Sequence, residues 1–361
     1  MGHAETIDAR VPPVAVWQVL EKLRGQDLLD WRLAEQPDRP SADARNLPSE
    51  FPFGWYPVLL SSELEPGVVK PLRHFATELA IWRGFDGEVR MVDAYCKHLG
   101  AHMGHGGTVD GNELRCPFHA WRYDGEAGVV TDVPYAKRIP PQVKRKCIRT
   151  WHVTEANRWI WMWYHPHDLP PQWEVLDHPE CSDPDWTEFE IHEWNVWGSL
   201  QNMAENGVDF AHFKYIHGTA TFPEAELEFH DLGRKAVIRA KMGTPMGEVD
   251  GQIAFDTRGP GQSWTRFTGI SETLLVACLT PVERDHIRVR FCFTQPREQA
   301  EGPMGGLARA MIRDICKQFD QDKVVWDQQK FEANPIICDG DGPIPRFRQN
   351  YVKFYAGEAP A

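Results

Sequence analysis

The chain has 361 residues, of which 42% are hydrophobic and 25% charged, a composition typical of a globular protein with about two domains. Its net charge of −13 argues against a nucleic-acid-binding protein, which needs a basic face. No apolar run approaches the ~18 residues that span a bilayer, and the first residues lack the basic and apolar regions of a signal peptide. Its eight cysteines form no dense framework, which suits a reducing compartment, so we expect a cytoplasmic protein. We expect the six cysteines from Cys147 onward to be buried, inert thiols: Cys147, Cys181, Cys278, Cys292, Cys316 and Cys338.

Residues 1–50 are polar and largely compatible with helix. Leu20, Leu23 and Leu28 give a weak apolar stripe that ends before the loop residues around Pro40. We expect this helical extension to pack against the body of the protein or against another subunit, and we assign no chemistry to it.

Residues 51–168 have the pattern of a β domain. Two short apolar runs flank an Asp-Gly turn at Asp86, and two more Asp-Gly turns follow at Asp110 and Asp124. Short strands with such turns predict a small antiparallel sandwich. One further strand alternates large residues, which we assign to the core: Trp159, Trp161 and Trp163.

Two mixed pairs of cysteine and histidine lie in this β domain. Cys96 and His98 are separated by one residue, and Cys116 and His119 by two. A zinc finger normally presents two cysteines and then two histidines, so a structural zinc site fits the ligand order poorly. Mixed pairs suit a cluster with two unlike irons, one held by two sulfurs and the other by two imidazoles. That is the Rieske [2Fe–2S] arrangement, and the two loops would carry it at one end of the sandwich.

A run of positive charge follows the second pair, in a chain whose net charge is negative. One interpretation is a solvated face, and the other is a docking patch for an acidic electron-donor protein. The run contains no acidic residue between its ends, and its members are Lys137, Arg138, Lys144, Arg145, Lys146 and Arg149.

A second metal motif follows a proline-rich connector. On a helix, Asn206, Asp209 and His212 step by three, so neighbours in that row share a face. His217 lies five residues beyond His212, about 140° away on an ideal helix. Both imidazoles therefore reach one metal only if the helix ends or bends near His217, which Gly218 permits. Two histidines and one carboxylate form the facial triad of non-haem Fe(II) oxygenases.

Periodicity indicates the third ligand. Asp322 falls within an apolar helical stripe, where an unpaired carboxylate is costly to bury, whereas Asp320 points to roughly the opposite side. We choose Asp322, and a buried salt bridge is the alternative. The stripe consists of Leu307, Met311, Ile315, Phe319 and Trp326.

Residues 225–300 alternate in places and predict a sheet under the iron-bearing helices, which makes the fold class α+β. Four phenylalanines in or before this region are either pocket lining or core: Phe210, Phe213, Phe222 and Phe229.

Several of these stretches resemble one known family, the Rieske-type oxygenases. Residues 96–101 and 116–121 match its two cluster loops nearly residue for residue, although lysine replaces the usual arginine before His98. Residues 206–217 resemble its iron motif, and residues 321–326 the segment that supplies the carboxylate. The closing stretch 339–355 resembles the tail of 3-ketosteroid 9α-hydroxylase oxygenase components and of the related cholesterol 7-desaturases.

The resemblance implies a role for each candidate residue. Asp209 would not bind iron; it would link His212 to His119 of an adjacent chain, which implies a ring of chains, most simply a homotrimer. The alternative is a carboxylate that only orients His212. Asn206 would lie near the iron. Cys96 and Cys116 would hold one cluster iron, His98 and His119 the other, and His212, His217 and Asp322 a mononuclear Fe(II).

The resemblance also implies a domain division and an activity. The chain would comprise a helical extension (1–50), an all-β Rieske domain (51–168) and an α+β catalytic domain (169–361). It would be a terminal oxygenase that takes electrons from NAD(P)H through a ferredoxin or flavin reductase and uses O2 to hydroxylate a flat, hydrophobic, steroid-like substrate. A desaturase, a demethylase and an aromatic-ring oxygenase are alternatives. A Rieske electron carrier is the alternative outside enzymes, but it leaves the second metal motif unexplained.

Overall fold

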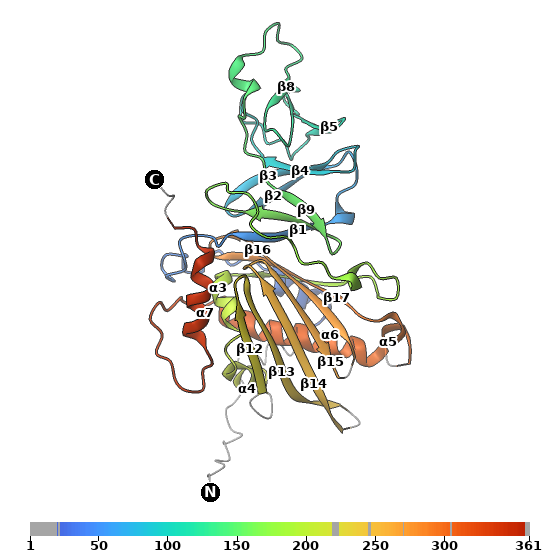
Figure 1. Cartoon of the computed structure of the whole chain (residues 1–361), viewed down its shortest axis with the longest axis vertical. Helices are drawn as coiled ribbons and strands as arrows, with labels where there is room; N and C mark the ends of the chain where they lie inside the picture. The colour runs from blue at the N-terminus through green and yellow to red at the C-terminus, as the bar shows by residue number, and fades with distance from the viewer. Residues whose placement is uncertain are drawn as a thin grey trace.

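The structure is a computed structural model with an elongated shape (Figure 1). Small sheets lie at one end, and a large sheet with its helices lies at the other, so the predicted α+β fold class is confirmed. No helix in the described part of the chain combines the length and apolar character needed to cross a bilayer. The described residues are 20, 22–218, 224–244, 247–269, 271–303 and 305–357.

Three small antiparallel sheets form the first end. One has the order β1-β10-β9, from β1 (Gly54–Leu60), β10 (Trp159–Tyr164) and β9 (Val153–Ala156). The second has the order β2-β3-β4, from β2 (Val69–His74), β3 (Thr77–Arg83) and β4 (Val89–Asp93). The third runs from β5 to β8 and contains β5 (Thr108–Asp110), β6 (Glu113–Arg115), β7 (Arg122–Tyr123) and β8 (Val130–Asp132). Short 3-10 turns complete this half: η1 (Ser61–Glu63), η2 (Pro141–Lys144) and η3 (Pro179–Cys181).

The Asp-Gly dipeptides lie where the sequence predicts turns. Asp86 lies between β3 and β4, which pair with Trp82 opposite Arg90. Asp110 ends β5 and pairs with Glu113 of β6 across the next turn. The third dipeptide separates β7 from β8. All three turn predictions are therefore confirmed.

Strand β10 joins the small sheets to the large one. All six of its residues are buried, as predicted for a core strand. Its tryptophans pack in one hydrophobic cluster with Val276 and Cys278 of the large sheet, while Ile160 and Met162 belong to another cluster. The alternation of large residues along β10 therefore serves two separate cores.

The predicted sheet of the second half is confirmed as seven antiparallel strands in the order β11-β17-β16-β15-β14-β13-β12. Helix α6 (Gly305–Trp326) runs across this sheet (Figure 1). The strands are β11 (Glu190–Val196), β12 (Glu224–His230), β13 (Gly233–Thr244), β14 (Gly247–Arg258), β15 (Gln262–Thr268), β16 (Thr273–Glu283) and β17 (His286–Thr294). The other helical segments are α3 (Leu200–Glu205), α4 (Ala211–Tyr215), α5 (Arg297–Glu301), α7 (Ile344–Tyr351) and η4 (Val352–Phe354).

The described part of the N-terminal extension packs against the body of the same chain, one of its two predicted roles, while residues 1–19 and 21 lie outside the described residues. Helix α2 (Gly25–Leu33) lies on β11 and α6. Two nitrogens of the Arg32 guanidinium, Nε and Nη2, donate to the Asp320 carboxylate at 2.8 and 2.6 Å. This ion pair is buried on both sides, so it holds α2 to the helix that carries Asp322.

All eight cysteines are free, and most of the six outside the cluster pairs are buried, as expected. The exceptions are Cys147, which is half-buried, and Cys338, which is exposed. The expectation of a buried thiol is thus wrong for Cys338, because the loop between α6 and α7 carries it on the surface.

Candidate active site and its two metal centres

The two Cys/His loops have the same backbone turn. The N–H of Gly100 donates to the carbonyl of Cys96 at 2.9 Å, and the N–H of Ala120 donates to the carbonyl of Cys116 at 3.1 Å. Gly100 and Ala120 both have positive φ, at 71° and 60°. A residue with left-handed backbone conformation, four positions after each cysteine, therefore closes each loop. Glycine adopts this conformation more readily than alanine does.

These loops bring the four predicted cluster residues together. The Cys96 and Cys116 thiols are only 4% and 2% exposed. The rings of His98 and His119 are 4.7 Å apart, edge to face, and the Trp121 ring stacks on His98. Nδ1 of His98 is buried without a hydrogen-bond partner among the described residues. A buried ring nitrogen with no partner and two thiols that form no disulfide fit a metal cluster.

Tyr123 is a cluster-site residue that the motif did not reveal. Its hydroxyl lies 3.1 Å from Sγ of Cys96 and 3.0 Å from the backbone nitrogen of Lys97. Because the hydroxyl accepts the N–H of Lys97, its own proton is available for the sulfur. A tyrosine that is expected to be buried predicts a hydrogen-bond partner for its hydroxyl, but the sequence does not identify that partner.

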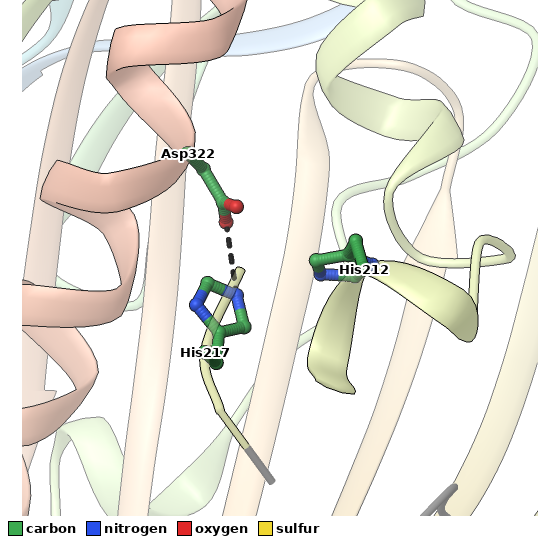
Figure 2. Close-up of side chains that lie close together, drawn as sticks. All are labelled: His212, His217 and Asp322. Carbon is green, nitrogen blue, oxygen red and sulfur yellow. Dashed lines mark ion pairs between the residues drawn. The ribbon is translucent and has the colours of Figure 1, made fainter. Parts of the chain in front are cut away.

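The second metal motif is also assembled in space. His212 lies on α4, His217 lies just beyond the end of α4, and Asp322 lies on α6 and points toward His217 (Figure 2). One ligand atom from each residue lies within 4.8 Å of the others. The Nε2 atom of His217 is 3.4 Å from Oδ2 of Asp322. In the described part of the chain this is the group of histidines and acids with metal-binding geometry.

The local backbone differs from the predicted single helix. Helix α3 ends at Glu205 and α4 begins at Ala211, so Asn206, Asp209 and His212 do not share one helical face. The predicted end before His217 is confirmed: α4 stops at Tyr215 and Gly218 has φ of 73°. The break between α3 and α4 changes which groups form hydrogen bonds with the two histidines.

Asp209 contacts His212 through backbone groups. Its carboxylate accepts the N–H groups of Ala211 and His212, at 3.1 and 3.4 Å, while its backbone carbonyl contacts Nδ1 of the His212 ring. The first N–H groups of α4 have no partner within the helix, so a carboxylate just before it binds them. Within one chain, the expected bond between the Asp209 carboxylate and the imidazole of His212 is therefore replaced by a backbone contact.

Each of the two imidazoles has an oxygen acceptor beside its Nδ1 atom. Nδ1 of His217 lies 3.0 Å from Oε1 of Gln321, and Nδ1 of His212 faces the Asp209 carbonyl. If each Nδ1–H donates, each Nε2 lone pair is free for a cation. The role of Gln321 is not predictable from its place beside Asp322, since its partner His217 is more than a hundred residues away in the sequence.

The charges of this site favour a cation between the three side chains. Burial lowers the pKa of His212, and the Asp322 carboxylate only partly opposes it. Burial also acts to lower the pKa of His217, but hydrogen bonding to Asp322 and the charge of that carboxylate raise it overall. A divalent iron would replace the proton that Asp322 attracts to His217, so the donor set fits the metal.

Asp320 and Asp322 point away from each other, as the helical period predicts. Asp320 is buried with Arg32 and accepts the indole N–H of Trp194 at 2.7 Å. Asp322 instead lines a cavity of about 280 Å³ on the other side of α6. Asp320 thus forms a buried salt bridge with an arginine, whereas the ion-pair partner of Asp322 is His217, the other predicted ligand.

That cavity lies between α6 and one face of the large sheet. Its volume is near the lower end of the roughly 300–1,000 Å³ typical of small-molecule sites. Phe213 and Asn206 line it, Phe229 packs elsewhere, and Phe222 lies outside the described residues. The apolar sheet face supplies Ile238, Ile253, Phe255, Phe267, Leu275 and Phe291.

The strands that flank the cluster loops and the helix that carries His212 lie far apart in the folded molecule. Strands β5 and β8 are at the top of Figure 1, whereas α4 lies beside the lower part of the large sheet, and strands β1 to β4 lie between them. The two candidate metal centres of one chain are therefore not neighbours.

Comparisons with known proteins match both halves. The Rieske [2Fe-2S] domain family matches residues 54–150, and the 3-Ketosteroid 9alpha-hydroxylase C-terminal domain family matches residues 162–355. A 3-ketosteroid-9-alpha-monooxygenase oxygenase component from Mycolicibacterium smegmatis is 30% identical over 88% of this chain and 86% of its own length. Cholesterol 7-desaturase from Xenopus laevis is 28% identical over 87% of this chain and 74% of its own length.

Solved structures share the fold. Dicamba monooxygenase bound to dicamba superposes with a TM-score of 0.64 at 19% identity, covering 83% of this chain and 96% of the other. NdmA of Pseudomonas putida CBB5 with caffeine gives 0.64 at 20% identity, covering 82% and 88%.

Together these matches assign the chain its cofactors and its class of enzyme. It is an oxidoreductase that uses a Rieske [2Fe–2S] cluster, a mononuclear iron and O2, with electrons supplied by a reductase or ferredoxin partner. The chain belongs to the Rieske non-haem iron monooxygenases, in the family defined by the 3-ketosteroid 9alpha-hydroxylase C-terminal domain.

Proposed function

We propose that this chain is the terminal oxygenase component that hydroxylates a flat, hydrophobic, steroid-like substrate. The observation that carries the proposal is the cavity of about 280 Å³, which has an apolar sheet face as one wall and His212, His217 and Asp322 in another. The names of the relatives, which include 3-ketosteroid monooxygenase components and cholesterol desaturases, support a polycyclic substrate.

The proposed ligands follow from the two assembled sites. Cys96, Cys116, His98 and His119 would hold the cluster, and His212, His217 and Asp322 the mononuclear iron. When bound, these groups supply electron storage and the oxidation of a C–H bond by O2. The chain supplies the rest: Gln321 and the Asp209 carbonyl orient the imidazoles, the sheet face holds the substrate, and the apolar lining excludes water.

We propose a homotrimer in which the cluster loops of one chain dock near the iron of the next. The separation of the two sites within one chain supports this arrangement. So does the surface beside the cluster, where Leu99, Phe118 and Tyr135 are 65%, 61% and 58% exposed. Asp209 is half-buried in the turn before α4, and it would link His212 to the neighbouring cluster.

The basic run is the proposed docking patch for the electron donor. Lys137, Arg138, Lys144 and Arg145 are exposed and form no ion pair within the described residues. Val143 and Cys147 of the same segment pack against the core that holds Cys96 and Cys116. The patch thus lies on the cluster-bearing core, where an acidic donor would be steered to the cluster.

The division into residues 1–50, 51–168 and 169–361 also remains our proposal, as does a cytoplasmic location. The absence of disulfides among all eight cysteines supports a reducing compartment.

Product analysis tests the function. The purified protein, with its iron and cluster and a reductase, would be incubated with a panel of 3-ketosteroids and sterols, and the products would be identified by mass spectrometry. A product one oxygen heavier supports hydroxylation, whereas loss of two hydrogens supports desaturation. If coupled O2 uptake occurs only with small aromatic acids or methylated purines, the steroid assignment is wrong.

A further inference from the structure

The substrate cavity contains a buried cation without a counter-ion. Arg234, the second residue of β13, lines the cavity and is 7% exposed. Its Nη2 donates to the Ala204 carbonyl at 2.5 Å, while its Nε has no partner in the described part of the chain. A buried guanidinium normally pairs with an acid, because removing its charge from water is costly.

The acid whose charge acts on Arg234 is already paired. Glu205 contributes to the electrostatic environment of Arg234, but its two carboxylate oxygens accept Nε and Nη2 of Arg348 at 2.7 and 3.0 Å. No carboxylate of the described residues forms an ion pair with Arg234. Burial lowers the pKa of Arg234 to about 10, so the guanidinium is still protonated at neutral pH.

A second donor without a partner lies beside it. Tyr351, the last residue of α7, lines the same cavity and is 4% exposed, and its hydroxyl has no partner among the described residues. Both residues pack on Phe347: the guanidinium lies 4.7 Å from that ring and the Tyr351 ring 5.2 Å from it. Burial raises the pKa of Tyr351 well above its usual value, so the phenol keeps its proton.

We propose that Arg234 and Tyr351 form an anion-binding subsite of the cavity, which binds a carboxylate carried by the polycyclic substrate. A role for Arg234 as a clamp on α3 explains its bond to Ala204, but it explains neither the missing counter-ion nor the unpaired hydroxyl of Tyr351. A carboxylate offers acceptors for both donors and neutralises the buried charge. The inference rests on the proposed function, and it narrows the substrate from neutral steroids to steroid acids.

Binding to the oxidised holoenzyme tests this subsite without turnover. Titration calorimetry would compare a 3-ketosteroid that bears a side-chain carboxylate with the methyl ester of the same acid. We expect the acid to bind on the order of 10- to 100-fold more tightly than the ester, as for a hydrogen bond to a charged group. Arg234→Gln should remove this preference.

Two further variants separate binding from folding. Tyr351→Phe removes a hydroxyl that has no partner, so it should leave the melting temperature unchanged but weaken binding of the acid more than binding of the ester. Arg346→Gln removes an exposed cation from the same helix, one that stacks on Phe229 outside the cavity, and should leave the preference intact.

The outcomes distinguish this inference from the proposed function. Equal affinity for acid and ester in the native protein, or a preference that survives in both Arg234→Gln and Tyr351→Phe, would overturn the subsite and leave the steroid assignment standing. Failure of both compounds to bind a protein with full iron content would overturn both.

Discussion

Nδ1 of His217 lies 3.0 Å from Oε1 of Gln321, the residue immediately before Asp322. One turn of α6 thus supplies both a proposed iron ligand and the acceptor that orients another. The remaining nitrogen of His217, Nε2, faces the Asp322 carboxylate at 3.4 Å. The side chain of Gln321 therefore selects the tautomer in which Nε2 can bind a metal.

Replacing Gln321 by leucine should weaken iron binding. The imidazole of His217 loses its acceptor, and loss of such a partner typically lowers metal affinity roughly 10- to 100-fold. The measurement is the mononuclear iron content after dialysis against a graded series of chelators. Gln321→Glu keeps an acceptor and should retain iron. Gln318→Leu is a control, since Gln318 bonds to Asp314 on the same helix. Equal iron retention in all three variants would show that Gln321 has no positioning role.

Asp322 and Asp320 should respond to substitution in opposite ways. Asp322→Ala should remove the mononuclear iron and hydroxylation while the visible spectrum of the cluster persists, because the cluster loops lie at the other end of the chain. Asp320→Asn should keep the iron but leave Arg32 buried without its full counter-charge, and loss of one partner of a buried pair costs about 3–5 kcal/mol of stability. Metal analysis and urea unfolding separate the two. Continued turnover by Asp322→Ala would reject this ligand.

How far the sequence predicts this site depends on the range of each interaction. The cluster loops and the end of α4 before His217 are encoded within a few residues, and Asp322 follows from the regular period of one helix. The break between α3 and α4 was not predicted, because a spacing of three fits both a helix and a turn. The contacts of Gln321 and Arg234 join distant segments, so no local pattern reports them.

Tyr123 should tune the reduction potential of the cluster. Its hydroxyl lies 3.1 Å from Sγ of Cys96, and hydrogen bonds to cluster sulfurs stabilise the reduced state. Tyr123→Phe should therefore lower the potential, by about 40 mV if the bond contributes about 1 kcal/mol. Redox titration followed by EPR measures the change. Tyr135→Phe is a control, since that hydroxyl accepts the indole N–H of Trp121 and no cysteine contact is recorded for it among the described residues. An unchanged potential in Tyr123→Phe would reject the assignment.

The basic run at residues 137–149 should control the rate at which the donor protein reduces the cluster. Reversing Lys144, Arg145 and Lys146 to glutamate should slow reduction roughly 10-fold or more at low ionic strength and flatten its salt dependence, because steering by complementary charge is lost. Stopped-flow absorbance of the cluster measures the rate. Reversing Arg309, Arg313 and Lys317, exposed on α6, makes the same change in net charge elsewhere. If both triple variants slow equally, the effect comes from net charge and the segment is no docking patch.

Stability should fall as the pH drops below neutral, and His74 should contribute to the slope. Burial lowers the pKa of His74 from 6.5 to about 4, although its Nδ1–H donates to the Pro281 carbonyl. The unfolded chain therefore binds this proton at a higher pH than the folded chain does. The contribution of neutral His74 is complete above pH 6.5 and is lost as the pH falls toward 4.

His74→Gln keeps a donor for Pro281 but cannot titrate, so its unfolding free energy should depend less steeply on pH within this window. The difference should reach at most about 1.4 kcal/mol per pH unit, the effect of one proton. Anaerobic urea unfolding at a series of pH values measures both slopes. His286→Gln should behave in the same way, since burial also lowers the pKa of His286 to about 4. Identical slopes in the native protein and both variants would show that acid destabilisation arises from other groups.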